Sequence, residues 1–259
     1  MSSYIKSEFY RIFHYKWTYL FIAICSALLV SSNVLLAVLR YSDASFSYGN
    51  TAFAFANFIS NVVFVFILCI SVASMIFGNE HTNHTMKNSV SYGITRGKIY
   101  FSKLIIEIVY ALIAFVIITG FFIASAYLLL EHSHENEIME LLKMFAASLP
   151  LLLFALATTN CFIFIIEGTG ASIAAITGLL IALPLVSNFL GMKFEIFRRL
   201  AKVLPWNMIS SIGIEMKPYS IVLPWAGNAG YYNCWLAGIL QMIIIIIIGY
   251  LVFRKREIK

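Results

Sequence analysis

Six apolar runs, each close to 20 residues long and nearly free of charge, constrain this chain more than any other feature. They cover 17–39, 57–77, 108–130, 144–166, 171–190 and 235–253. A run of this length crosses ~30 Å of hydrocarbon as an α-helix, in which the backbone polar groups are paired internally. Since 61% of the residues are hydrophobic and 12% charged, a soluble enzyme, a nucleic-acid binder and a disordered protein are excluded. We therefore expect an all-α membrane protein with six transmembrane helices in one domain, 1–259.

The distribution of Lys and Arg predicts the orientation, because these residues gather on the cytoplasmic side. With both termini in the cytoplasm, the inner segments hold 11 basic residues and the outer segments hold 7. The inner set is Lys6, Arg11, Lys16, Lys87, Arg96, Lys98, Lys103, Arg254, Lys255, Arg256 and Lys259. The outer set is Arg40, Lys143, Lys193, Arg198, Arg199, Lys202 and Lys217. The first run is too long for a cleaved signal peptide and is interpreted as a span.

Residues 1–16 precede the first span and carry an amphipathic pattern. Ile5, Phe9, Ile12 and Phe13 share one helical face, and basic residues occupy the rest. We predict a helix that lies in the inner membrane interface. The alternative is a basic flank that serves only the topology.

The cytoplasmic loop 78–103 is too long and too polar for a simple turn. Its first half favours a short helix, Gly93 breaks that helix, and Thr95 is placed to cap the helix of the third span. A helix held along the cytoplasmic face by a glycine hinge suits contact with another protein. We predict this coupling helix between spans 2 and 3.

Two patterns in this loop resemble binding motifs but lack required residues. Gly93, Gly97 and Lys98 are spaced almost as in a phosphate loop, yet one residue is missing and Ile99 replaces the Ser or Thr. His81 and His84 lack the spacing of a metalloprotease site. No catalytic, cofactor-binding or metal-binding residue is therefore expected, with weak metal binding by the outer His132–His134 turn left open.

Two further segments depart from plain spans. The inner turn 167–170 carries Glu167, which either faces water or touches a cytoplasmic partner. The outer loop 191–233 begins with an amphipathic stripe and contains a near-repeat of Leu-Pro-Trp, at 204–206 and 223–225. Because Trp prefers the headgroup level and proline breaks helices, we predict an amphipathic or re-entrant hairpin before span 6. The alternative is an aromatic belt leading into that span.

Ionisable residues inside the spans would indicate a transport path, and the runs hold almost none. Glu107 precedes the third run, where we expect it to reach water. Polar residues such as Asn57, Asn61 and Asn160 are expected to bond neighbouring helices more than a substrate. The lack of buried carboxylates argues against a proton- or sodium-coupled pump.

The architecture and one local motif resemble the permease subunits of ABC-2 exporters. The motif runs through Phe77-Gly78-Asn79-Glu80, His84-Thr85-Met86-Lys87-Asn88, Ser91-Tyr92-Gly93-Ile94-Thr95-Arg96 and Phe101-Ser102-Lys103. The residues that match the family's form are Glu80, Thr85, Arg96, Ser102 and Lys103. His84 replaces the usual Gly and Thr95 the usual Ser. By size and general character, the chain is most similar to small bacterial permeases of bacitracin and lantibiotic resistance or immunity.

The resemblance implies a multi-pass permease of the bacterial cell membrane, an exporter subunit that dimerises with a second copy or a sister permease. ABC ATPase subunits bind ATP and Mg²⁺ and dock on the coupling loop. The coupling residues implied are Glu80, Thr85, Lys87, Arg96, Lys103 and Glu167. The outer-loop or substrate-contacting residues implied are Pro205, Trp206, Pro224, Trp225, Asn57, Asn61 and Asn160. The substrate would be an antimicrobial peptide or a lipid-like compound that is extracted from the membrane, and membrane lipids would surround the permease as partners. The rival hypothesis is a membrane sensor or scaffold that detects a peptide without transporting it.

Overall fold

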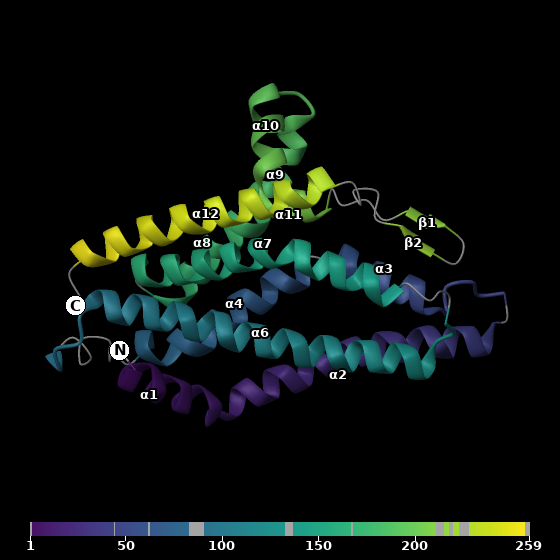
Figure 1. Ribbon diagram of the computed structural model, residues 1–259, viewed down its shortest axis with the longest axis horizontal. Coiled ribbons are helices and arrows are strands. Elements are labelled where there is room, and N and C mark those ends of the chain that lie inside the picture. The colour runs from purple at the N-terminus through teal and green to yellow at the C-terminus, as the bar shows by residue number, and fades with distance from the viewer. Residues whose placement is uncertain are drawn as a thin grey trace.

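The computed structural model describes residues 2–43, 45–61, 63–82, 91–132, 137–166, 168–210, 215–217, 220–222 and 228–256. Long helices run side by side along the long axis of the molecule, and both termini lie at the same end (Figure 1). These helices are α2 (Lys16–Ser42), α6 (Arg96–Leu129), α7 (Glu137–Ile165) and α12 (Asn228–Lys255). The extensive contacts are between α2 and α6 and between α7 and α12.

Shorter elements fill and flank this bundle. They begin with α1 (Ser2–Phe13), α3 (Thr51–Ser60), α4 (Val63–Thr82), α8 (Thr169–Thr177) and the π-helical turn η1 (Gly178–Ala182). They continue with α9 (Leu183–Gly191), α10 (Glu195–Val203), α11 (Pro205–Ser210) and the strands β1 (Glu215–Lys217) and β2 (Ser220–Val222). Helices α8, η1 and α9 form one continuous helical segment, Thr169–Gly191.

Within the described residues, five helical segments are long and apolar enough to cross a membrane: α2, α6, α7, α8–η1–α9 and the Tyr231–Lys255 part of α12. They correspond to five of the six predicted spans. The predicted second span, 57–77, is instead divided between α3 and α4, and the described apolar stretch of α4 is only Leu68–Phe77. Six continuous spans are thus not confirmed.

Two asparagines account for the end of α3. Asn61 caps the helix, its backbone N–H bonds to the Phe58 carbonyl, and its side-chain amide donates to the Asn57 carbonyl and to Asn57 Oδ1. Short polar side chains compete for backbone groups in this way and stop helices. The mean hydropathy of the run stays high despite Asn57 and Asn61, so it does not reveal the break between α3 and α4.

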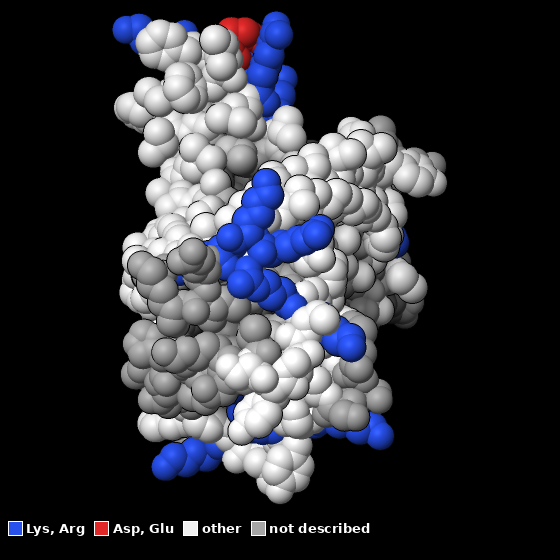
Figure 2. Space-filling model, turned by 90° about the vertical axis from the view of Figure 1, so that its left-hand side faces the viewer, with Lys and Arg blue, Asp and Glu red and all other residues white. Residues whose placement is uncertain are grey.

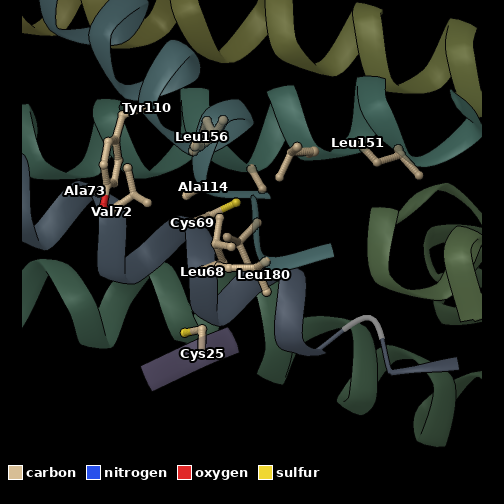
Figure 3. Close-up of a cluster of buried hydrophobic side chains, with 14 of the residues drawn as sticks. Cys25, Leu68, Cys69, Val72, Ala73, Tyr110, Ala114, Leu151, Leu156 and Leu180 are labelled. Carbon is tan, nitrogen blue, oxygen red and sulfur yellow. The ribbon is translucent and has the colours of Figure 1, made fainter. Parts of the chain in front are cut away.

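The core lies where α4 crosses α6 and α7. Figure 3 shows Leu68, Cys69, Val72 and Ala73 of α4 facing Ala114 of α6 and Leu156 of α7, with Leu180 of η1 beside them. All of these side chains are buried. Because lipid is as apolar as these residues, close packing and not exclusion from water holds such helices together, which explains the small residues among them.

The α7–α12 pair shows this close packing most clearly. A Cβ on Gly238 would lie 2.6 Å from Cβ of Pro150, and one on Gly249 would lie 2.9 Å from Sγ of Cys161. Pro150 lacks an N–H and cannot pair with the Ala146 carbonyl one turn earlier. The indole N–H of Trp235 donates to that carbonyl at 3.0 Å. An inserted proline is thus compensated by the neighbouring helix.

The outer loop has helices and a short sheet. The predicted amphipathic helix is present as α10, and Pro205 begins α11, where Pro is favoured because its missing N–H needs no partner. Strands β1 and β2 pair antiparallel, with Met216 opposite Ile221. This short strand pair was not predicted, and β-branched Ile221 and Val222 favour such extended pairing. The other elements of the described chain are helices, as expected for an all-α membrane protein.

Candidate coupling face and buried polar cluster

Arginine side chains close helix ends where the two termini lie. We call this the inner end of the molecule, because the sequence predicts that it faces the cytoplasm. The last carbonyls of a helix have no intrahelical partner, and cations are favoured there. Arg96, the first residue of α6, donates from Nη1 to the carbonyls of Phe253, Arg254 and Arg256 at 3.4, 2.7 and 2.6 Å. Arg96 thereby ties the start of α6 to the end of α12.

Two more arginines donate to carbonyls of neighbouring helices. Arg256 Nη1 donates to the Phe164 carbonyl, at the end of α7, at 2.6 Å. Arg11 of α1 donates to the Ile76 carbonyl of α4 at 3.0 Å. Guanidinium groups therefore connect the ends of α6, α7 and α12, and they connect helix α1 to α4 at a carbonyl that lies within α4.

Helix α1 is also held by a buried ion pair. Lys103 of α6 has a fully buried side chain, and its Nζ lies 3.2 Å from Oε2 of Glu8. The same carboxylate pairs with Arg11 at 2.6 Å. The Lys103 ammonium also lies 5.2 Å from the centre of the Phe77 ring, a cation–π distance. One acid of α1 thus joins cations from α1 and α6.

Aromatic rings pack below these charges. The ring of Phe164 lies 5.2 Å from that of Tyr100, 5.2 Å from that of Phe77 and 4.4 Å from that of Phe253, centroid to centroid. These rings come from α4, α6, α7 and α12. Since all four are buried, a movement of one helix end at this face must displace the others.

The surface of this end is basic. Figure 2 looks onto it and shows Lys and Arg gathered at its centre, with no Asp or Glu visible within that group. The described basic residues at this end include Arg96, Lys98, Arg254, Lys255 and Arg256. A positive face of this kind is typical of the cytoplasmic side.

A buried polar cluster lies between α6 and α7. Glu107 is fully buried, the Thr159 hydroxyl donates to its Oε1 at 2.5 Å, and the Asn160 amide donates to its Oε2 at 3.3 Å. Oδ1 of Asn160 is buried and has no hydrogen-bond partner among the described residues. The expectation that Glu107 reaches water was wrong, because α6 begins 12 residues before the predicted span and carries Glu107 into the protein interior.

Comparison with known families assigns the chain. It matches the family described as ABC-2 family transporter protein over residues 4–184, well over half of its length. The chain belongs to the ABC-2 transporter family. No curated protein and no solved structure matches it. The match confirms the coarse resemblance, whereas the resemblance to bacitracin and lantibiotic permeases stays a prediction.

The family match makes the chain a membrane transporter component, and ABC-2 permeases generally have ABC ATPase partners. The matched residues 4–184 include most of α1, the elements from α2 to α8 and the region 83–95, but not the end of α12 that belongs to the inner end described above. The C-terminal elements α10, α11, β1, β2 and α12 lie beyond the match.

The predicted coupling residues of this permease fall into two groups. The side chains of Glu80, Thr85, Lys87 and Glu167 lie outside the described residues, although the Glu80 backbone belongs to α4. Arg96 and Lys103 are described, and both are engaged within the chain. Gly93 has φ +80°, a left-handed conformation that glycine adopts freely, and Thr95 is the N-cap of α6 but makes no side-chain cap bond.

The predicted outer and substrate residues do not form one site. Asn57 and Asn61 end α3 and are exposed, whereas Asn160 is buried beside Glu107. Pro205 is buried and Trp206 packs against the core, while Pro224 and Trp225 lie outside the described residues. Sequence reasoning did not single out Glu8, Thr159 or Asn207 as site residues. It counted Arg256 only as a topological charge and expected Glu107 to reach water. In the sequence, the signal for such residues is a polar side chain at a helical position in or near an apolar run.

Proposed function

We propose that the chain is the membrane-spanning permease subunit of an ATP-driven exporter. Separate ABC ATPase subunits bind ATP and Mg²⁺, and a second copy or a sister permease completes the transport path. The substrate is amphipathic, such as an antimicrobial peptide or a lipid-like compound. Family membership supports the transporter class, and the interlocked inner end supports the coupling.

The observation that carries the mechanism is the connection of helix ends at the inner face. The region 83–90 lies in sequence between α4 and α6, so force applied there by an ATPase acts on both helices. Arg96 passes movement of α6 to α12, and Arg256 passes movement of α12 to α7. A substrate is moved only if it binds the two resulting states with different affinity.

The predicted residues take different parts in this proposal. Glu80, Thr85, Lys87 and Glu167 are proposed to contact the ATPase. Arg96 and Lys103 are positioning residues, since the first bonds to α12 and the second pairs with Glu8. The basic inner face favours an acidic docking surface on the ATPase, because complementary charge fixes the register of a complex more than it adds affinity.

Substrate contacts are proposed for the outer loop. Pro205 and Trp206 join α10 to the bundle, and Pro224 and Trp225 belong to the same loop. Amphipathic α10 suits a compound that is drawn from the outer leaflet. Antimicrobial peptides of the bacitracin and lantibiotic classes, and lipid-like compounds of similar amphipathic character, are the proposed substrates.

The test is purification of the tagged chain from the membranes of its own host in mild detergent. We expect an ABC ATPase subunit in stoichiometric amount, and ATP hydrolysis that vanadate inhibits. A chain that purifies with a histidine kinase and without any ATPase would overturn the proposal and favour the sensor.

A further inference from the structure

Helices α9 and α10 form a hairpin that stands away from the long helices (Figure 1). Gly191 closes it: a Cβ at this position would lie 3.1 Å from the Arg198 Cα and 3.2 Å from the Arg198 nitrogen. Any larger residue would push α10 away from α9. The hairpin is thus fixed by a close approach of two backbones.

A polar cavity of about 610 Å³ opens where this hairpin meets α11. Its lining includes Asn188 of α9, Arg198 and Lys202 of α10, and Asn207 of α11. The neighbouring surface is apolar, since Met192 and Ile196 expose 87% and 80% of their area. A pocket with two cations beside exposed apolar side chains suits a ligand that has an anionic head and an apolar remainder.

Asparagine amides form a fixed framework for this pocket. The buried Asn207 amide donates to the carbonyls of Ala201 at 3.0 Å and Pro184 at 3.3 Å. Its Oδ1 accepts from the Asn188 amide at 2.6 Å. Asn188 retains a second amide hydrogen for a ligand. The donors on the wall are therefore held in place before a ligand arrives, which lowers the ordering cost of binding.

The charges of the pocket are arranged for an anion. Arg198 and Lys202 are four residues apart on α10, a spacing at which like charges face each other and repel. Arg198 is partly neutralised by an ion pair with Glu195, whereas Lys202 has no ion pair within the described part of the chain. An anion bound between the two cations relieves this repulsion and gains charge-assisted hydrogen bonds.

We propose that this cavity binds a phosphate group, carried either by a membrane lipid or by a soluble compound. Arg198 and Lys202 neutralise the phosphate, and the Asn188 amide donates to it. The apolar side chains beside the pocket accept the acyl chains when the carrier is a lipid. Binding at this site requires no ATPase, so it can be tested independently of the proposed transport function.

The experiment is native mass spectrometry of the full chain in detergent with added phosphatidylglycerol, and with phosphatidylcholine as the zwitterionic comparison. We expect preferential binding of phosphatidylglycerol, weakened about tenfold by Arg198→Gln or Lys202→Gln, the loss expected for one charge-assisted bond. Arg199→Gln is the matched control. It removes the same charge from the same helix, but Arg199 is 80% exposed and does not line the cavity.

Competition with glycerol 1-phosphate distinguishes the two carriers. If it displaces phosphatidylglycerol from the wild type, the phosphate group alone is sufficient. If it does not, the lipid carrier is required, and either outcome supports the site. The proposal is overturned if Arg199→Gln weakens lipid binding as much as Arg198→Gln does, or if neither pocket variant weakens it. The substituted side chains are exposed, and gel filtration checks that the variant proteins are folded.

Discussion

Arg96 closes the end of α12, because its guanidinium donates to three carbonyls that have no helical partner. Arg96→Gln removes this cap. We expect a loss of about 1–2 kcal/mol in the free energy of unfolding in detergent and faster amide exchange over the last turn of α12. Lys98→Gln removes the same charge from an exposed position of α6 and is expected to change stability little. Equal effects of both variants would contradict the capping role.

A buried acid within a membrane span is the kind of residue that binds a coupling ion. Glu107 of α6 is such an acid, so the effect of removing its charge distinguishes ATP-driven from ion-driven transport. Glu107→Gln keeps the shape of the side chain. If the Asn160 amide rotates, its unpaired Oδ1 can accept the new N–H, and Thr159 can still donate. We expect the variant to fold and to retain export activity. Loss of export with unchanged thermal stability would indicate ion coupling through Glu107.

The sequence predicted several individual residues correctly and missed others for a physical reason. Gly93 and Thr95 were placed well, because conformational freedom and capping are local properties. Lys103 was expected at the end of the coupling loop and Glu107 at the water-facing start of the third span. A charge-free window cannot detect that Glu8 pairs with Lys103, or that Thr159 donates to Glu107, since these partners lie far away in the chain.

At the scale of elements, α7 and α12 are joined by a bond that compensates for a proline. Trp235→Phe leaves the Ala146 carbonyl without its donor and should cost about 1 kcal/mol of unfolding free energy. In a Pro150→Ala background, the restored backbone N–H can pair with Ala146, and the same change should cost almost nothing. A double-mutant cycle measures this difference. Equal costs in both backgrounds would show that the indole matters only through its packing.

The sequence predicted the elements well where the hydrophobic pattern of a single helix is sufficient to define it. The amphipathic stripe of α10 and the long runs of α2 and α12 follow from the local sequence. The division of the second span did not, because Asn61 ends α3 through side-chain bonds that hydropathy does not measure. The pairing of β1 with β2 was also missed, since three-residue strands carry almost no periodic signal.

For the whole molecule, both termini lie at one end, and that end is basic. We predict that it faces the cytoplasm. Single cysteines at Tyr92 and Tyr41 report the two ends, because these side chains are 86% and 96% exposed and the four native cysteines are buried. A membrane-impermeant maleimide on intact cells should label Tyr41→Cys but not Tyr92→Cys. The reverse pattern would invert the topology, and unlabelled wild type is the control.

The buried ion pair of Glu8 with Lys103 and the capping by Arg96 make the inner end behave as one unit. If an ATPase closes against the region 83–95, this unit converts the closure into a change at the outer loop. The account therefore requires that damage to the inner connections separates hydrolysis from substrate handling without preventing assembly of the complex.

The direct measurement is ATP hydrolysis by the permease–ATPase complex in lipid nanodiscs, with and without an added amphipathic antimicrobial peptide. The account predicts that the peptide raises the hydrolysis rate of the wild type and of Lys98→Gln. In Arg96→Gln the complex stays assembled, but its hydrolysis no longer responds to the peptide. If hydrolysis by the ATPase is the same with the wild-type chain, with Arg96→Gln and with no permease at all, the coupled-exporter account is contradicted.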